Sequence, residues 1–386
     1  MGSPYQKYRD HLRVAWLVPV AFFYWHPVLS EFTRRFPQTV IFTARWRGFA
    51  PGFEDSFKLE LVGNLNYVEV NSQTEGYGSG ITFLSPEIIP ILLKLRPQII
   101  FADSFRIWTL FALMLKPLGR WRVIVAYEGS SPGVDFRGSK LRLWLRRLMV
   151  RWADAFITNS KAGKEYLTNI LHASEKKVSV QPYEIPVPQA LLKEKATLIR
   201  KIPASPVFLF VGGLIPRKGV QGLLKACHIL RESDCAEFTL LVIGDGPQRE
   251  SLETFAKDHQ LDECVQWLGR VDYGSLGAYF EQADVFILPT LEDTWGVVIL
   301  EAMIFSKPIL CSKWAGAFEV IEDGKNGFIF DPRQPKELAN LMLRFIGNEV
   351  SADAMGTASK EIMERYTPTV AAETMMSVVD SLVTEL

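Results

Sequence analysis

Two carboxylates mark the segment LPTLEDTWGVVILEAM (residues 288–303), where a predicted strand ends and a predicted helix begins. Asp293 lies in the loop before the helix, where an acidic side chain can bind sugar hydroxyls. Glu301 lies inside the helix between the apolar runs VVIL and AMIF. Because burial of an unpaired carboxylate is unfavourable, Glu301 needs a partner. A ribose diol would serve, and a structural salt bridge to a nearby Lys or Arg is the alternative.

The residues between these two acids suit a diphosphate. Gly296 lets the backbone approach a ligand closely, since glycine carries no side chain. The N–H groups of Val297 and Val298 begin the helix, where unpaired donors and the positive end of the helix dipole favour anions.

Two glycine-rich turns precede this segment, and each joins a predicted strand to a predicted helix. The first, VGGLIPRKGV (residues 211–220), carries Arg217 and Lys218, and its N–H groups and cations suit phosphate. The second is VIGDGPQRESLE (residues 242–253). Neither turn is a P-loop, and the second lacks the third glycine of a dinucleotide fingerprint. Taken alone, Arg217 and Lys218 are more typical of a solvated turn than of a ligand site, and a tight glycine turn is sufficient to explain the second segment.

The elements that position these residues read as buried strands alternating with helices. Continuous Val, Ile and Phe runs indicate parallel strands that are covered on both faces. In the first half, strands are predicted at residues 13–18, 39–44, 66–70, 98–103, 122–127, 154–159 and 177–182. In the second half, they are predicted at residues 207–212, 238–244, 265–269, 284–289, 308–312 and 326–331.

Two prolines in YEIPVPQ (residues 183–189) indicate a stiff connector between two α/β domains. We predict a first doubly wound domain over 1–186, a second over 187–368, and a final helix over 369–386 that returns to the first domain. Two such Rossmann-like domains in tandem face a central cleft at the carboxyl ends of their strands, where ligands of this class bind.

The composition indicates a cytoplasmic protein. Its 386 residues are 48% hydrophobic and 22% charged, which is ordinary for two globular domains. We expect no signal peptide, and no apolar run reaches the length needed to cross a bilayer. The four cysteines show no CxxC spacing, so we expect reduced thiols and neither a disulfide framework nor a zinc site. They are Cys227, Cys235, Cys264 and Cys311.

Charge is divided unequally between the two halves. Residues 1–186 carry 24 Lys and Arg against 15 Asp and Glu, whereas residues 187–386 carry 19 against 28. The basic, aromatic segment SKLRLWLRRLMVRWADAF (residues 139–156) contributes to this excess and could lie on an anionic membrane surface. An ordinary surface helix is the alternative. No recognition motif accompanies the charge, which disfavours nucleic acid.

In this order and spacing, the motifs of the second half resemble the retaining GT-B glycosyltransferases of glycosyltransferase family 4. That family shows a GRLxxxKG-like turn, a GxGPxxxxLE-like turn, an LGxV strand end, a PT loop, and two acids eight residues apart before EAM. The counterparts here are GGLIPRKG, GDGPQRESLE, LGRV, Pro289–Thr290 and DTWGVVILEAM. The first half resembles the family in its order of elements and in the stretch WADAFITNSKAGKEYL.

The resemblance implies a donor site in the second domain, and catalysis without metal or other cofactor. Lys218 and Arg217 would hold the diphosphate of a nucleotide sugar, most simply a UDP-sugar, with Gly212 and Gly213 in the same turn. Asp293 and the loop Thr294, Trp295 and Gly296 would hold the transferred sugar, and Glu301 the ribose. The base pocket would be lined by Asp245, Gly246, Arg270 and Val271, with Thr290, Val297 and Val298 completing the donor site.

The sequence departs from the family pattern at several positions. Gly213 stands where the family has a diphosphate-binding arginine, and Asp293 is one methylene shorter than the usual glutamate. No glycine-rich loop follows the first strand. Glu128 stands near the position of a family histidine, so Glu128 or His26 is the candidate active-site residue in the first domain.

The leading hypothesis is a retaining glycosyltransferase that acts on a lipid, a glycan or a small metabolite. A catalytically weak nucleotide-sugar-binding or scaffold protein is the main alternative. A GT-B phosphorylase or epimerase is a third.

Overall fold

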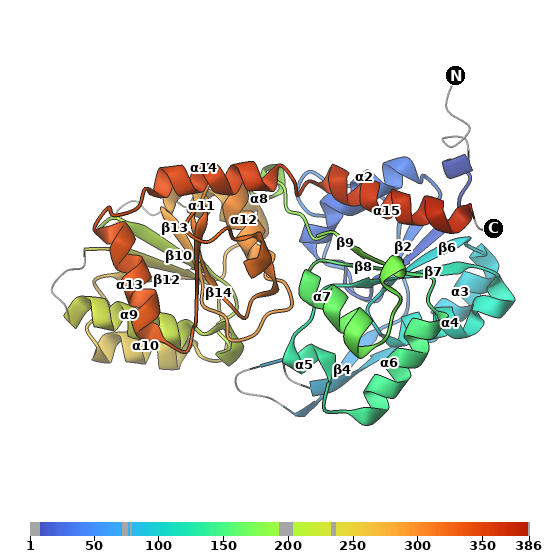
Figure 1. Cartoon of the computed structure of the whole chain (residues 1–386), viewed down its shortest axis with the longest axis horizontal. Coiled ribbons are helices and arrows are strands. Elements are labelled where there is room, and N and C mark those ends of the chain that lie inside the picture. Colours follow the sequence, from blue (N-terminus) through green and yellow to red (C-terminus); the bar gives the residue numbers. More distant parts are fainter. Residues whose placement is uncertain (1–7, 72–75, 78, 193–203, 233–236, 385–386) are drawn as a thin grey trace, which may run out of the picture. The chain divides into compact units, whose positions relative to one another are not determined.

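The chain forms two compact units, each built on a parallel sheet covered by helices (Figure 1). The computed structural model describes residues 8–71, 76–77, 79–192, 204–232 and 237–384. Unit 1 lies within 1–72, 78–185 and 366–386, and unit 2 within 73–77 and 186–365. Both sheets belong to the predicted class of doubly wound α/β domains.

The sheet of unit 1 has the strand order β3-β2-β1-β6-β7-β8-β9, and every neighbouring pair is parallel. Its strands are β1 (Val14–Leu17), β2 (Thr39–Thr43), β3 (Leu59–Leu61), β6 (Ile99–Asp103), β7 (Arg122–Tyr127), β8 (Ala155–Thr158) and β9 (Val178–Val180). Strands β1, β2, β6 and β8 are buried at every position, as expected for strands covered on both faces.

Helices cover both faces of this sheet (Figure 1). Their bounds are α2 (His26–Arg35), α3 (Ile88–Leu95), α4 (Ile107–Gly119), α5 (Pro132–Asp135), α6 (Lys140–Trp152), α7 (Lys161–Glu165) and α15 (Pro368–Val383). Helices α3, α4 and α6 pack on one face through residues such as Leu92, Trp108 and Met149. Helix α15 packs against α2, where the Arg9 and Asp380 side chains form an ion pair.

One predicted strand of the parallel sheet takes a different place. Residues 66–70 fall in β4 (Leu65–Asn71), which pairs antiparallel with β5 (Ser79–Leu84) as a separate two-stranded sheet. The segment NYVEV contains the polar residues Asn66 and Glu69, so it is not the continuous apolar run that indicates a strand buried on both faces. The strand itself was predicted correctly, but its place in the parallel sheet was wrong, and β3 and β5 were not predicted.

The sheet of unit 2 has the order β12-β11-β10-β13-β14-β15, again all parallel. This is the strand order of the dinucleotide-binding fold. The first three strands of this unit fill one half of the sheet, and the next three fill the other half, beginning again beside the first strand. The strands are β10 (Val207–Val211), β11 (Thr239–Ile243), β12 (Val265–Gly269), β13 (Val285–Leu288), β14 (Ile309–Ser312) and β15 (Gly327–Phe330). All six lie within the predicted segments.

Seven α-helices accompany the described strands of unit 2: α8 (Pro188–Leu191), α9 (Val220–Glu232), α10 (Arg249–Asp258), α11 (Leu276–Gln282), α12 (Val298–Ile304), α13 (Pro335–Ile346) and α14 (Ala352–Met363). Helices α9, α10 and α13 share one apolar core with the sheet. Cys227, Cys264 and Cys311 are buried free thiols, and Cys235 lies outside the described residues. None of the helices in the described ranges is long and apolar enough to cross a bilayer.

Candidate functional site

Three turns meet at the carboxyl ends of β10, β11 and β12, and backbone hydrogen bonds hold them together. The N–H of Gly212 donates to Ile243 O (2.9 Å), and that of Leu214 donates to Asp245 O (3.0 Å). The turns can approach so closely because they lack side chains: a Cβ on Gly244 would lie 1.8 Å from Gly212 O. This edge of the sheet also carries the predicted residues Gly213, Gly246, Arg270 and Val271.

The turn that carries the two cations is fixed to the loop after β13. A short 3₁₀ helix (Pro216–Lys218) ends at Gly219, whose φ of 69° is left-handed. A Cβ on Gly219 would lie 2.0 Å from Pro289 O, so the two segments pack backbone against backbone. Thr290 Oγ1 donates to Arg217 O at 2.9 Å, which ties the same segments a second time.

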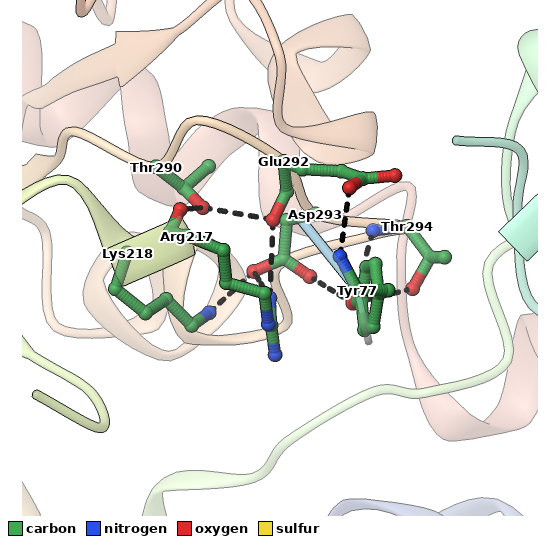
Figure 2. A network of polar contacts seen from close by, with 7 residues as sticks. All are labelled: Tyr77, Arg217, Lys218, Thr290, Glu292, Asp293 and Thr294. Carbon is green, nitrogen blue, oxygen red and sulfur yellow. Dashed lines mark hydrogen bonds and ion pairs between the residues drawn. The ribbon is translucent and has the colours of Figure 1, made fainter. Parts of the chain in front are cut away.

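These contacts bring Lys218 and Arg217 to the buried carboxylate of Asp293 (Figure 2). Lys218 Nζ bonds Asp293 Oδ2, and Arg217 Nη1 lies 3.6 Å from the same oxygen. Burial alone would raise the pKa of Asp293, but the charges of Lys218 and Arg217 and the hydrogen bonds of the carboxylate outweigh it and hold the pKa below its usual value. The site therefore contains a charged carboxylate and two cations.

Tyr77, which the sequence analysis did not identify, completes this cluster (Figure 2). Its hydroxyl donates to Asp293 Oδ1 at 3.1 Å and lies 3.3 Å from Thr294 Oγ1. Its ring lies 4.1 Å from the guanidinium carbon of Arg217, and its N–H donates to Glu292 Oε2 at 2.9 Å. Tyr77 belongs to unit 2 by its contacts although it stands between β4 and β5 in the sequence.

Glu301, the second predicted acid, lies in α12 and is only 4% exposed. Burial raises the pKa of Glu301 to about 7, although a hydrogen bond with the Tyr273 side chain acts in the opposite direction. Among the described residues Glu301 makes no salt bridge, so the alternative of a structural salt bridge to Lys or Arg is not observed. Tyr273 is a second residue that the sequence analysis did not identify.

The rest of the predicted sugar loop is well packed. Trp295 is 2% exposed, and its carbonyl accepts a hydrogen bond from the N–H of Ala317 (2.7 Å). Gly296 has a φ of 93°, which glycine adopts readily. Val297 and Val298 start α12 as predicted, with no side-chain cap. Trp295 thus supports the loop through its buried ring.

The two candidates from the first half of the chain lie in unit 1. His26 is fully buried, and its Nδ1 accepts the N–H of Ala50 at 2.8 Å. Burial lowers the pKa of His26 to about 4, despite a backbone hydrogen bond that favours the charged form. It stands among the aromatic rings of Phe23, Trp46, Phe49 and Phe57. The low pKa favours the neutral form of His26, and its role as the active-site residue of the first domain stays a prediction.

Glu128 directly follows β7 and hydrogen-bonds the buried side chain of Glu184. Two carboxylates cannot donate to each other, so this contact requires a proton on one of them. Burial and then the charges of Glu128 and Asp103 raise the pKa of Glu184, which places the proton there. Asn159 Nδ2 donates to Glu184 Oε2 at 3.0 Å. Glu128 therefore contacts a buried side chain of unit 1, whereas Asp293 belongs to unit 2.

Two family models match this chain, one in each half. Residues 28–183 match the family model described as Glycosyltransferase Family 4, and residues 195–362 match the model described as Glycosyl transferases group 1. A crystal structure of Anabaena HepE in complex with UDP aligns with a TM-score of 0.73 at 16% identity, over 96% of this chain and 100% of that one. Sucrose-phosphate synthase from Thermosynechococcus elongatus aligns with a TM-score of 0.70 at 17% identity, over 97% and 100%. The fold is GT-B.

Several curated relatives are named as glycosyltransferases. The sulfoquinovosyl transferase SQD2 of Arabidopsis thaliana is 25% identical over 299 residues, 73% of this chain and 56% of that protein. An uncharacterised glycosyltransferase of Methanocaldococcus jannaschii is 26% identical over 229 residues, 57% of this chain and 63% of that protein. The chain thus spans a little over half the length of these relatives. It belongs to the GT-B glycosyltransferases, and within them to the family 4 type.

Because Gly219 packs against Pro289 O, one added methyl group at Gly219 should destabilise the protein strongly. Gly219→Ala should lower the free energy of unfolding by about 1–2 kcal/mol through its left-handed φ. The clash with Pro289 O should add about 1–3 kcal/mol more. Gly324→Ala is the matched control, because Gly324 has a φ of 77° and open space around its Cα. Urea unfolding of both variants tests this, and equal losses would contradict the packing of the two segments.

The pKa of Glu301 predicts a pH-dependent stability. Its folded-state value of about 7 lies above the value of an unfolded glutamate, so the charge opposes folding as pH rises through that range. Glu301→Gln should match the parent near pH 4 and exceed its stability by up to roughly 3 kcal/mol at pH 8. Thermal unfolding across this range measures the difference, with the exposed Glu250→Gln as control. A difference that does not change with pH would show that Glu301 is not a buried acid.

Proposed function

We propose that the chain transfers a sugar from a nucleotide-diphosphate sugar, with a UDP-sugar as the first candidate, to a lipid, glycan or small-molecule acceptor. The observation that carries this proposal is the convergence of Lys218, Arg217 and buried Asp293 at the carboxyl edge of a dinucleotide-type sheet. Structures of HepE were determined with UDP and with UDP-glucose, which supports this choice of ligand.

The chemistry of these groups fits the parts of such a donor. Lys218 and Arg217 would bind the diphosphate and stabilise the charge that develops on it as the sugar leaves. Asp293 would accept hydrogen bonds from sugar hydroxyls, and Glu301 with Tyr273 would bind the ribose diol. We infer that these cations and the surrounding N–H groups supply the charge stabilisation without a metal, and that the anomeric configuration is retained.

This assignment predicts which substitutions abolish transfer. Lys218→Ala should lower kcat by about 10²–10³-fold, because it removes a cation from the leaving diphosphate. Glu301→Gln should chiefly weaken nucleotide binding, since it keeps the shape of the side chain but not its charge. Donor turnover by the purified protein, after a thermal-shift screen of nucleotide diphosphates and their sugars, measures both effects.

The control for this experiment is Arg231→Ala, because Arg231 lies on α9 and pairs with Glu263. Near-normal activity in both Lys218→Ala and Glu301→Gln would refute the donor-site assignment. Nucleotide-sugar binding without turnover, across a wide panel of acceptors, would instead favour a binding or scaffold protein.

We further propose that the outer face of α6 binds an anionic membrane surface. Leu141 and Trp144 are 74% and 62% exposed, and Arg147 and Arg151 lie on the exposed side of the same helix. An exposed apolar and basic helix face is typical of a peripheral membrane contact. Arg146 has a different role: its guanidinium donates to Tyr166 Oη (2.8 Å) and Asp135 O (3.1 Å) within unit 1.

The membrane surface predicts a loss of vesicle binding in defined variants. Trp144→Ala and the double substitution of Arg147 and Arg151 by Ala should each reduce co-sedimentation with anionic vesicles, each basic residue contributing about 1 kcal/mol. The charge-matched control replaces Arg34 and Lys58, which lie elsewhere on unit 1. Equal binding to neutral and anionic vesicles, or an equal loss in the control, would refute this proposal.

A further inference from the structure

The hydroxyl of Tyr77 makes the contacts of a sugar hydroxyl. It donates to Asp293 Oδ1 at 3.1 Å and accepts the N–H of Thr294 at 3.4 Å (Figure 2). A group that donates to a carboxylate and accepts from a backbone amide at the same time is what a sugar hydroxyl offers, and a phenol offers the same pair. Burial and then the charge of Asp293 raise the pKa of Tyr77, so the hydroxyl keeps its proton.

The position of the ring supports the same interpretation. The ring lies over the guanidinium of Arg217, with the guanidinium carbon 4.1 Å from its centroid. Arg217 also donates to Glu292 O at 3.1 Å, and Glu292 accepts the N–H of Tyr77. Tyr77 is therefore held by its backbone, its ring and its hydroxyl, which is an arrangement more specific than a loop resting on a charged surface.

We propose that Tyr77 is a donor-selecting residue, whose hydroxyl occupies the place of a sugar hydroxyl at Asp293 and Thr294 until a nucleotide sugar displaces it. This inference rests on the proposed function of Asp293 as a sugar-binding residue. A bare nucleotide uses the cations and leaves the hydroxyl of Tyr77 in place. A nucleotide sugar displaces the phenol without a net loss of hydrogen bonds only if one of its hydroxyls replaces both contacts.

A selection of this kind favours sugars with a hydroxyl that can donate and accept at that position. A sugar that lacks the hydroxyl, or carries it in the wrong configuration, would displace Tyr77 without recovering its hydrogen bonds. Such a loss leaves buried polar groups unpaired, which is the strongest means a binding site has to reject a close analogue.

The experiment compares the affinities of UDP and UDP-glucose in the full chain by calorimetry. Tyr77→Phe keeps the ring on Arg217 and the N–H bond to Glu292, and removes only the competing hydroxyl. The ratio of the Kd of UDP to the Kd of UDP-glucose should rise about fivefold, the effect of one net hydrogen bond. Tyr273→Phe is the matched control, because it removes a phenol hydroxyl beside Glu301 and should weaken both ligands equally.

Each outcome separates this inference from the proposed function. A ratio that falls in Tyr77→Phe would show that the hydroxyl binds the sugar directly, and an unchanged ratio would place Tyr77 outside the sugar subsite. Either result would overturn the inference. If UDP-glucose binding still depends on Lys218, the donor-site assignment is preserved. Absence of nucleotide binding in the parent and in Tyr77→Phe would refute both.

Discussion

The ion pair between Lys218 and Asp293 joins two loops that are 75 residues apart in the chain, and the rest of the site is arranged around it. A carboxylate that is 7% exposed remains charged only if opposite charge lies beside it, because burial disfavours the charged form. The cations reach Asp293 because Gly219 lets the two loops touch at the backbone. The ion pair of the site therefore depends on the absence of a side chain at Gly219.

Asp293 and Glu301, the two predicted acids of the segment 288–303, differ in pKa because their side-chain partners differ. Both are nearly excluded from solvent, yet the pKa of Asp293 is lowered and that of Glu301 is raised to about 7. Asp293 faces two cations, whereas the side-chain partner of Glu301 is the neutral hydroxyl of Tyr273. Environments that shift two carboxyl groups in opposite directions are typical of functional sites, where each group has a separate task.

The sequence alone predicts most strands of the two parallel sheets and the charged residues that meet at Asp293, but not the tyrosines beside them. Twelve of the thirteen predicted strands belong to the two parallel sheets, because continuous apolar runs are a strong signal of strands covered on both faces. The exception, residues 66–70, belongs to the antiparallel pair β4–β5, and its polar residues Asn66 and Glu69 were the available signal against a strand buried on both faces. Tyr77 is 216 residues from Asp293, and no periodicity or motif indicates so distant a contact.

Asp293 pairs with the two cations that would bind the diphosphate of the donor. On the proposed function, this pairing affects how a nucleotide and a nucleotide sugar bind. A diphosphate that takes Lys218 and Arg217 leaves a buried carboxylate without its counter-charges, which is unfavourable unless new donors replace them. Tyr77 already satisfies Oδ1 of that carboxylate, so a bare nucleotide has to compensate for the loss at Oδ2. A nucleotide sugar brings anion and hydroxyls together, and can satisfy the cations and the carboxylate in one step. On the proposed function, this arrangement would favour the complete donor over its nucleotide product, which is the direction that repeated turnover requires.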